Sequence, residues 1–466
     1  MSLAEIERYD PERISAVGER AVVVGGSIAG LATARVLADA FDEVVVLERD
    51  PLPDEPVSRD GAPQTEHPHV MLEAGRATLE DLFPGFCEGV LAEGGLMIDF
   101  STDMREYNSG DFLADTRERF PTYCASRALF EHVVRQRLTV VENVELCGGR
   151  RVTGYLTDAD ASTITGVRVR NDDTQVTLPA DLVVDATGRT SRTPRWLDDH
   201  GYDAPPVEEV TIDVSYRSIR LERPPDDRRM RMVAPSAPRR RGAALIPIEG
   251  DRWEIIIQGI HEREPPTDRQ GLVEYAEQLP VSTIADLMKR QSWVSDEIRQ
   301  YPYPASLRRR YEALSEFPDG LVVTGDAVAS FNPIYGQGMS VAALEALCLH
   351  HALAADGLDA IGARVFDRAA GVVDNVWNIV VGGDFDYPQT TGPRPTGAWL
   401  TNWYMDRLVR RAHSDPTLSA AFARVTRLEE PPTTLLEPGV VWRVIRPATD
   451  SISLRSFARR TVTALS

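Results

Sequence analysis

Lysine is almost absent from this chain of 466 residues. Lys289 is the only one, so nearly all of the 51 basic residues are arginine, and 71 acidic residues give a formal net charge of −20. Such a surface repels nucleic-acid phosphates, which excludes nucleic acid as a partner. Codon bias in a GC-rich genome accounts for missing lysine but not for excess carboxylate. The composition therefore favours an acidic surface adapted to a high-salt cytosol, and we expect a cytoplasmic protein.

Cysteine and long apolar runs are also scarce. The four cysteines are scattered, with no CxxC pair and no histidine at ligand spacing, so we expect neither a disulfide framework nor a metal site. No run of 18 apolar residues occurs, and the N-terminal segment lacks a basic stretch followed by an apolar one. These absences predict no membrane span and no secretory signal.

The chain does have enough residues for more than one core, since a single core usually stops growing at about 250–300 residues. It opens with a short apolar run, Ala21–Val24, of the kind found in strands buried on both faces. A helical pattern follows over Leu31–Phe41, and a second apolar run over Val44–Leu47. This order predicts a βαβ unit and an α/β, Rossmann-like first domain.

The turn after the first strand carries Gly25-x-Ser27-x-x-Gly30, and Glu48 ends the second strand. In dinucleotide folds the three glycines make the tight turn, admit the pyrophosphate and let the helix pack closely. Ser27 stands at the second position, where its hydroxyl could add a hydrogen bond to phosphate beside the helix N-terminus. A carboxylate at Glu48 would take both ribose hydroxyls and repel a 2′-phosphate, which selects adenosine without that phosphate.

Two further segments each follow a predicted buried strand: Asp185-Ala-Thr-Gly188, and Gly325-Asp326 with the turn Asn332–Met339 behind it. Together with the opening turn they resemble the three FAD motifs of flavoprotein monooxygenases with the p-hydroxybenzoate-hydroxylase fold. The resemblance covers residues 20 to about 360. It implies that the middle motif serves FAD and nicotinamide, and that Asp326 holds the ribityl chain. The cofactor-binding residues expected from the motifs and the resemblance are Gly25, Ser27, Gly30, Glu48, Arg49, Arg127, Asp185, Gly188, Gly325, Asp326, Pro333, Gly336, Gly338 and Met339.

Other stretches, among them Leu47–Pro53, Gly61–His69 and Asp384–Pro388, are similar to the branch with polyether-type olefin epoxidases and uncharacterised FAD-dependent oxidoreductases. Aromatic hydroxylases of the fold usually carry a histidine where this chain has Ala329 and an asparagine where it has Ser340. Both departures count against simple phenol hydroxylation.

Three side chains are candidates for the edge of the flavin ring: Gln64, His67 and His69. The resemblance places their loop there, and a histidine could exchange a proton at neutral pH. Most histidines in proline-rich loops do no chemistry, so no catalytic residue is assigned firmly. Arg127 matches an arginine that contacts FAD in the family, although as a solvated surface arginine it would be unremarkable.

We expect four segments: residues 1–204, the first part of the FAD-binding domain; 205–305, an inserted antiparallel sheet for substrate; 306–365, the second part of the FAD-binding domain; and 366–466, a helical C-terminal region. Within the last segment, the apolar residues from Leu454 to Leu465 predict a terminal helix packed on the protein.

The function implied by the resemblance is that of an FAD-dependent monooxygenase. One oxygen atom of a flavin C4a-hydroperoxide would pass to an alkene or other electron-rich carbon of a hydrophobic small molecule, by epoxidation or hydroxylation. NADH or NADPH would supply electrons, directly or through a separate flavin reductase.

Two alternatives stay open. One is an FAD-dependent reductase that saturates isoprenoid double bonds, similar to geranylgeranyl reductases, and the other is a non-catalytic FAD-binding redox protein. A flavin-dependent halogenase shares the fold but needs a lysine in its oxidant tunnel. Lys289 belongs to a predicted surface helix, which argues against that activity.

Overall fold

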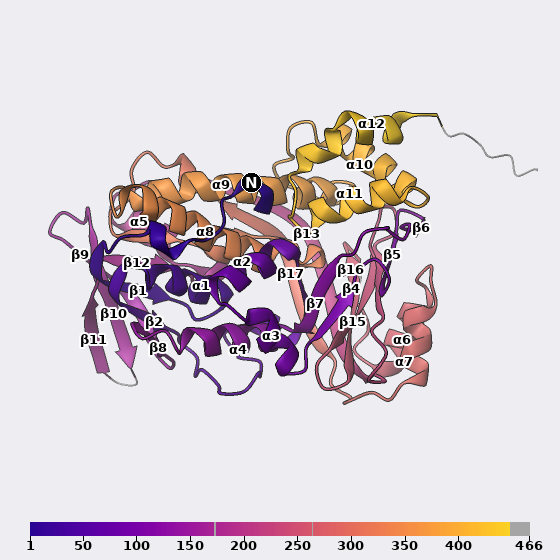
Figure 1. Cartoon of the computed structure of the whole chain (residues 1–466), viewed down its shortest axis with the longest axis horizontal. Helices are drawn as coiled ribbons and strands as arrows, with labels where there is room; N and C mark the ends of the chain where they lie inside the picture. Colours follow the sequence, from indigo (N-terminus) through magenta and orange to yellow (C-terminus); the bar gives the residue numbers. More distant parts are fainter. Residues whose placement is uncertain (172–173, 263, 448–466) are drawn as a thin grey trace, which may run out of the picture.

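The computed structural model describes residues 1–171, 174–262 and 264–447. A parallel sheet with its helices lies on the left of Figure 1, a large antiparallel sheet on the right, and the C-terminal helices above the latter. This arrangement confirms the predicted fold: a Rossmann-like domain of the p-hydroxybenzoate-hydroxylase type, an antiparallel sheet and a helical C-terminal region. The terminal helix expected over 454–465 lies outside the described residues.

The parallel sheet has the strand order β18-β12-β1-β2-β8 among the described residues. The strands β1 and β2 are the two apolar runs at the start of the chain, and Ala21 to Val23 are completely buried. Their burial on both faces explains why apolar side chains follow one another without alternation. The strands are β1 (Gly18–Val24), β2 (Phe41–Leu47), β8 (Val144–Cys147), β12 (Leu182–Asp185) and β18 (Leu321–Val323).

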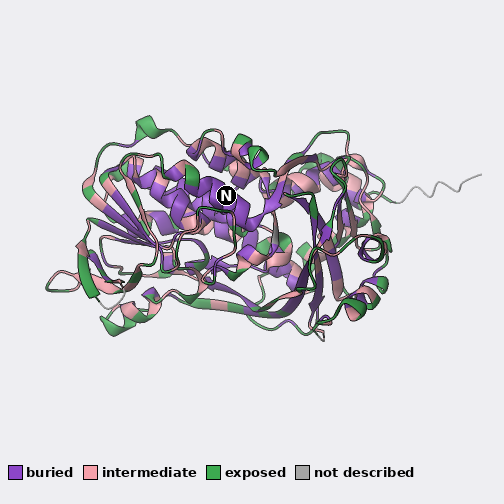
Figure 2. Ribbon diagram, turned by 90° about the horizontal axis from the view of Figure 1, so that it is seen from below, coloured by how far each residue is buried: buried purple, intermediate pink, exposed green. Residues whose placement is uncertain are grey.

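Helices cover one face of this sheet and a second, small sheet covers the other. Val22 and Val45 pack against Ile164 and Val167 of the small sheet, on the face opposite the helices. Figure 2 shows the buried residues concentrated in the helical layer and the strands beside it. The covering elements are α1 (Ile28–Leu37), α2 (Glu73–Leu82), α3 (Phe86–Ala92), α4 (Arg127–Leu138), α8 (Gly338–Asp356), β9 (Arg151–Thr157), β10 (Ile164–Asn171) and β11 (Thr174–Pro179).

Two predicted segments differ from the structure. The helix expected to reach Phe41 ends at Leu37, because Ala38 to Ala40 form a turn and Phe41 already begins β2. The loop expected over 51–70 contains a 3-10 turn, η3 (Pro63–Glu66), and the start of a strand, β3 (Pro68–Met71). The strand β3 pairs with β7 (Pro121–Ser126), which also pairs with β4 (Leu96–Asp99). The strand β3 is short and forms because it pairs with a distant segment. Its own sequence therefore gives little indication of a strand.

The large sheet has the order β19-β17-β13-β16-β15-β14-β5-β6 in the described part of the chain. It extends past the predicted segment 205–305 at both edges, because β5 and β6 come from before it and β19 from after it. The domain limits themselves stay a prediction. One face packs on α6 and α7, and the other faces the parallel-sheet domain. The elements are β5 (Met104–Asn108), β6 (Asp111–Phe112), β13 (Val207–Glu222), β14 (Met230–Val233), β15 (Arg241–Ile248), β16 (Arg252–Ile260), β17 (Arg299–Arg309), β19 (Ala329–Ser330), α6 (Arg269–Glu277) and α7 (Thr283–Arg290).

The C-terminal region begins with a long helix that packs on α8 and continues into a small helical lobe with its own core. Among the described residues, α8 is the one helix long and apolar enough to cross a membrane, but 78% of its apolar window is buried inside the protein. It is therefore the central helix of the core. The helices that follow it are α9 (Ile361–Asp384), α10 (Ala398–Ala412), α11 (Pro416–Thr426), η8 (Pro432–Leu436) and α12 (Pro438–Ile445).

The packing of α1 on the first strand depends on the absence of a side chain at Gly30. A Cβ atom there would lie 1.9 Å from the carbonyl oxygen of Gly25, which is backbone and cannot turn away. We expect Gly30→Ala to lower the Tm through about 2–3 kcal/mol of strain. Gly439→Ala is the control, because a Cβ at Gly439 meets nothing within 4 Å. Equal Tm values for the two variants would contradict this account.

Candidate functional site

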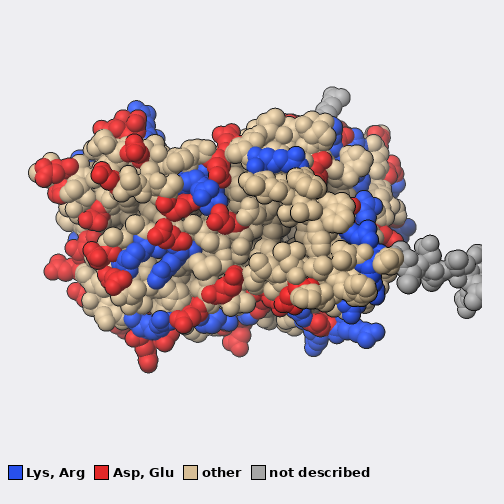
Figure 3. Space-filling view, turned by 90° about the horizontal axis from the view of Figure 1, so that it is seen from above, with Lys and Arg blue, Asp and Glu red and all other residues tan. Residues whose placement is uncertain are grey.

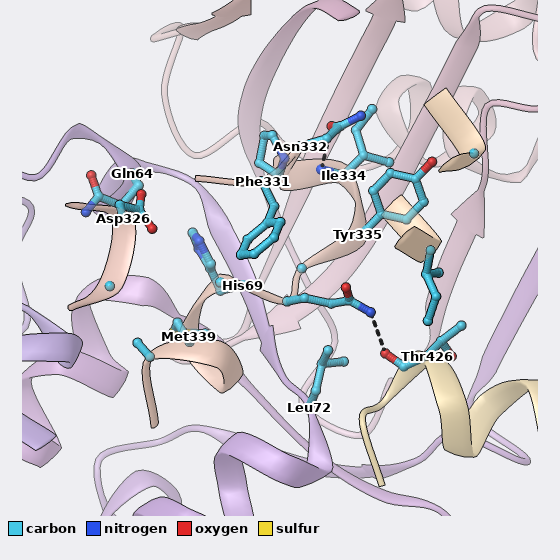
Figure 4. A pocket seen from close by; sticks show the side chains of 18 of the residues that line it. Gln64, His69, Leu72, Asp326, Phe331, Asn332, Ile334, Tyr335, Met339 and Thr426 are labelled. Atoms are coloured by element: carbon cyan, nitrogen blue, oxygen red, sulfur yellow. Dashed lines mark hydrogen bonds between the residues drawn. The ribbon is translucent and has the colours of Figure 1, made fainter. Parts of the chain in front are cut away.

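A cavity of about 2010 Å³ lies where the parallel sheet, the large sheet and the C-terminal helices meet. The carboxyl ends of β1, β2 and β12 open into it through Val24, Leu47 and Asp185. This is the edge at which ligands bind in parallel α/β sheets. The turn after β18 and the start of α8 form the middle of the cavity, shown in Figure 4.

The glycine turn after β1 lies at one end of the cavity. Gly25 has a φ of +115°, which favours glycine, and its backbone passes so close to Ala186 that a Cβ would lie 2.4 Å from that carbonyl oxygen. The N–H of Gly26 donates to Glu48 Oε2 at 2.8 Å. The Glu48 carboxylate is thus held at the end of β2, where it also lines the cavity. Both features are those of the predicted dinucleotide turn.

A buried cluster of charges supports this turn. Arg59 donates to Glu131 Oε1 through Nε at 2.9 Å and Nη2 at 2.6 Å, and Arg127 Nη1 lies 3.2 Å from Glu131 Oε2. Burial opposes ionisation of Glu131, but Arg127 and Arg59 outweigh it and lower the pKa of that carboxyl. Sequence reasoning missed Arg59 and Glu131. The available signal was Glu131 four residues after Arg127 on one predicted helix face.

The Ser27 hydroxyl has hydrogen-bond partners other than the phosphate that the sequence suggested. It donates to Glu131 Oε2 at 2.7 Å and accepts from Arg127 Nη2 at 2.9 Å, so it is not free to donate to a phosphate. Ser27 therefore links α1 to α4. Arg127 is buried rather than a surface residue, and its Nη1 makes no hydrogen bond within the described residues. Arg127 Nη1 forms an ion pair with Glu131 but no hydrogen bond in that part of the chain, and a guanidinium of this kind that lines a cavity suits an anionic ligand.

Asp185, predicted to bind the cofactor, also forms hydrogen bonds within the protein. Its carboxylate accepts from the hydroxyls of Thr187, Ser191 and Thr193, each at 2.5 Å, and so shapes the loop after β12. These bonds occupy the carboxylate within the protein, although the residue borders the cavity. Gly188 in the same loop has a φ of +79° and also lines the cavity.

Asp326 follows β18 and is exposed toward the cavity. Its position deep in the molecule raises the pKa of the carboxyl, while Arg189 and Arg127 oppose the shift. The preceding Gly325 adopts a φ of +66°, and its N–H donates to Glu345 Oε2 at 2.5 Å. This carboxyl of α8 thereby fixes the turn that presents Asp326.

The turn between β19 and α8 passes along the cavity with Pro333, Gly336, Gly338 and Met339 among its lining residues. A Cβ atom on Gly336 or Gly338 would meet no protein atom within 4 Å, so the space beside these backbones belongs to the cavity. The N-terminus of α8 has no side-chain cap, which leaves its first N–H groups available to a ligand.

The end of α9 anchors that turn. Asn332 Nδ2 donates to Asp384 Oδ1 at 3.0 Å, and the Tyr335 hydroxyl donates to the same oxygen at 3.4 Å. Asp384 is buried, and its Oδ2 makes no hydrogen bond within the described residues. The sequence marked Asp384 as part of a resembling stretch but gave it no role.

Gln64, His67 and His69 do not share one position. Gln64 and His69 line the cavity and lie beside Asp326 and Met339 in Figure 4. His67 is buried behind them, with Nδ1 2.7 Å from Ser218 Oγ, so its expected place at the cavity edge is wrong.

Both rings are uncharged at neutral pH. Burial lowers the pKa of His69 to about 4 and that of His67 to about 3. Neither ring is therefore a cationic proton donor at neutral pH, and the proton exchange expected for this loop stays a prediction. Arg49 also lines the cavity, is half exposed, and donates to the Gly61 carbonyl at 3.2 Å.

The fold and the cavity define an FAD-dependent oxidoreductase of the monooxygenase type. Residues 19–358 match the family described as FAD binding domain, and the chain belongs to that family. It is 32% identical over 434 residues to Protein Rv3254 of Mycobacterium tuberculosis, with 88% of this chain and 90% of that protein covered.

Two solved structures share the fold at low identity. p-Nitrophenol 4-monooxygenase PnpA from Pseudomonas putida superimposes with a TM-score of 0.62 at 17% identity, covering 89% of this chain and 99% of that one. The flavin-dependent brominase Bmp2 gives 0.61 at 15% identity, covering 88% and 94%. At such identities the likeness concerns the fold alone.

The residues present fit FAD. The site offers an uncapped helix start and, near the glycine turn, the Arg127 guanidinium, whose Nη1 makes no hydrogen bond within the described residues; both suit a pyrophosphate. At its other end, glycine backbones and the second uncapped helix border open space, as a flat ring requires.

We expect Arg127→Gln to weaken FAD binding by about 10- to 100-fold, the value of a charge-assisted hydrogen bond lost in a buried site. Titration of the apoprotein with FAD measures this affinity. Arg137→Gln on the same helix is the control, since Arg137 donates to the carbonyls of Pro84 and Gly85 away from the cavity. An equal loss in both variants would show that Arg127 acts only through the stability of α4.

A second expectation concerns the stability of the turn held by Asp384. Burial raises the pKa of Asp384 to about 7, although Asn332 and Tyr335 oppose the shift. Between about pH 4 and pH 7 the folded state then binds more protons than the unfolded state, so this contribution to stability is lost as the pH rises. Asp384→Asn cannot ionise and keeps an acceptor oxygen. We expect the free energy of unfolding of this variant to exceed that of the unmodified protein increasingly between pH 5 and pH 8, by on the order of 1–3 kcal/mol at the upper end. The difference in Tm should grow over the same range.

The control for this measurement is Asp367→Asn, which removes a charge from the exposed side of the same helix. Its Tm difference from the unmodified protein should stay constant over the same pH range. A constant difference for Asp384→Asn as well would show that its carboxyl is ionised throughout.

Proposed function

We propose that the protein transfers one oxygen atom from dioxygen to an alkene or other electron-rich carbon of a hydrophobic small molecule, with FAD as cofactor and NADH or NADPH as electron donor. The observation that carries this proposal is the continuity of one cavity from the dinucleotide turn, past the start of α8, to the inner face of the large sheet. Cofactor and substrate would therefore share one space whose inner part lies between the parallel sheet and the large sheet.

The chain's own residues would bind and orient the cofactor. Glu48 lies where the adenosine ribose would bind, Arg127 near the pyrophosphate and Asp326 near the ribityl chain. The start of α8 would stabilise negative charge on the ring system, because unpaired N–H groups and the helix dipole point toward it. When bound and reduced, FAD supplies the activation of dioxygen.

The substrate side of the cavity is mostly uncharged. Tyr216, Ile246, Ile256 and Gln258 of the large sheet face it, together with Phe331 from the turn before α8. Such a surface binds an apolar molecule and offers few groups able to take a proton from a phenol. This lining favours a hydrophobic substrate with an electron-rich carbon.

The alternatives predict other behaviour of the same site. A reductase of isoprenoid double bonds would use the cavity without oxygen activation, and a non-catalytic redox protein would bind FAD without turnover. A halogenase would need its lysine at the cavity. Lys289, the one lysine of the chain, lies on α7 and pairs with Glu277, and it is not among the residues that line the cavity.

The deciding experiment is rapid mixing of the anaerobically reduced holoenzyme with oxygenated buffer, at high and low salt, while the flavin absorbance is followed. We expect a transient absorbance distinct from both oxidised and reduced flavin, because the protein around the inner part of the cavity limits contact with water and slows the unproductive release of peroxide. A trial alkene that fits the cavity should change the lifetime of this transient, and an oxygenated product should appear.

The monooxygenase proposal would be refuted if the flavin returned directly to its oxidised form and released all of the hydrogen peroxide, both with and without trial alkenes. Consumption of reduced flavin by an isoprenoid alkene under strict anaerobiosis would support the reductase instead. Absence of reduction by NADH, NADPH or a flavin reductase would favour the non-catalytic protein.

A further inference from the structure

The cavity does not end at the large sheet. It continues between the turn Asn332–Tyr335 and the C-terminal helices, where residues of α10, η8 and α12 form its wall. Pockets for a drug-sized ligand usually measure about 300–1,000 Å³. A cavity of about 2010 Å³ leaves room beyond a cofactor and a compact substrate.

The wall of this extension is apolar and open to solvent at its outer end. Trp399, Leu400 and Trp403 of α10 line it, with Leu436 and Ile445 on the facing side. The exposed fractions of Trp399 and Trp403 are 69% and 53%, which is high for tryptophan. In Figure 3 the half of the molecule that carries the C-terminal helices shows broad uncharged areas around a hollow.

These side chains lie outside the hydrophobic core of the lobe that carries them. That core contains Leu408 of α10, Leu418 of α11 and Val444 of α12. The apolar face toward the cavity is therefore additional surface. Contiguous apolar surface of this kind usually marks a binding site.

The charged groups along this extension are partnered within the protein. Arg410 Nε donates to Asp406 at 3.0 and 2.8 Å, and Asp386 accepts from Asn402 at 2.7 Å. The Arg394 guanidinium lies over the ring of Phe385. A ligand segment in this space would meet hydrocarbon and rings rather than free charge.

We propose that the extension is a channel for the substrate's apolar chain, so that the substrate class is a molecule with a long, uncharged hydrocarbon or isoprenoid-like segment. The segment lies between α10 and α12 while the reacting carbon lies at the large sheet. This inference deepens the proposed function and rests on it for the identity of the reacting end. The binding of the chain itself needs no reaction.

The test measures binding of 1-alkanols, from hexanol to tetradecanol, to the oxidised FAD holoenzyme by calorimetry. No reductant is present. We expect the Kd to fall by about fourfold for each added methylene until the chain fills the channel. The variant Trp403→Ala should weaken tetradecanol by about tenfold and hexanol by less than about twofold, since the short chain does not reach α10.

The matched control is Trp442→Ala. Trp442 on α12 has an exposed fraction of 63%, similar to the 53% of Trp403. Unlike Trp403, Trp442 is not among the residues that line the cavity. A second variant, Leu400→Arg, places a charge at the mouth and should also weaken tetradecanol selectively. Leu400 is half exposed, so the arginine can reach water without disturbing the fold.

Four results would overturn the proposal. The first is an alkanol affinity that does not depend on chain length, and the second is an equal loss of tetradecanol affinity in the Trp403 and Trp442 variants. The third is a dimer in sedimentation that Trp403→Ala dissociates. The fourth is tighter tetradecanol binding in a chain that ends at residue 447. The third result would assign the face to a second copy, and the fourth to the chain's own last residues. Failure of alkanol binding with the flavin transient intact would leave the monooxygenase proposal standing, whereas normal alkanol binding without the transient would refute that proposal alone.

Discussion

The approach of backbone to backbone at the first turn is the constraint on which the site depends. Gly30 brings α1 against the carbonyl of Gly25, and Gly25 brings the turn against Ala186 of the neighbouring loop. No side chain of any size fits either contact. These two contacts set the position of the α1 N-terminus relative to the edge of the parallel sheet. The loops after β1, β2 and β12 can then face a single cavity.

The charge cluster around Glu131 also holds the first turn in place, but burying its charges costs desolvation free energy. Taking one carboxylate and two guanidinium groups out of water is unfavourable unless they satisfy one another, and here the hydrogen bonds from Arg59 and Ser27 do so. The guanidinium of Arg127 remains short of one acceptor. The cluster therefore fixes the Arg127 guanidinium at the cavity before any ligand arrives, which reduces the reorganisation needed to bind an anion.

The sequence was enough to predict the two-sheet fold, the glycine turn and the strand ends, because each rests on local patterns such as Ala21–Val24. It did not reveal what the polar side chains contact. The cofactor contacts of Ser27 and Asp185 stay predictions, but the sequence did not show that their side chains bond to Glu131 and to the loop hydroxyls. The expected position of His67 at the cavity edge was wrong for the same reason, since tertiary contacts bury its ring, with Nδ1 2.7 Å from Ser218 Oγ of the large sheet.

The hydrogen bonds from the turn before α8 have a consequence beyond holding that turn. Asn332 bonds to the end of α9, and Gln337 Nε2 donates to the Thr426 carbonyl at the end of α11 (Figure 4). The loop beside the flavin position and the helical lobe thus belong to one hydrogen-bonded frame. If a molecule bound at the lobe changes the affinity for the cofactor by some factor, bound cofactor must change the affinity for that molecule by the same factor.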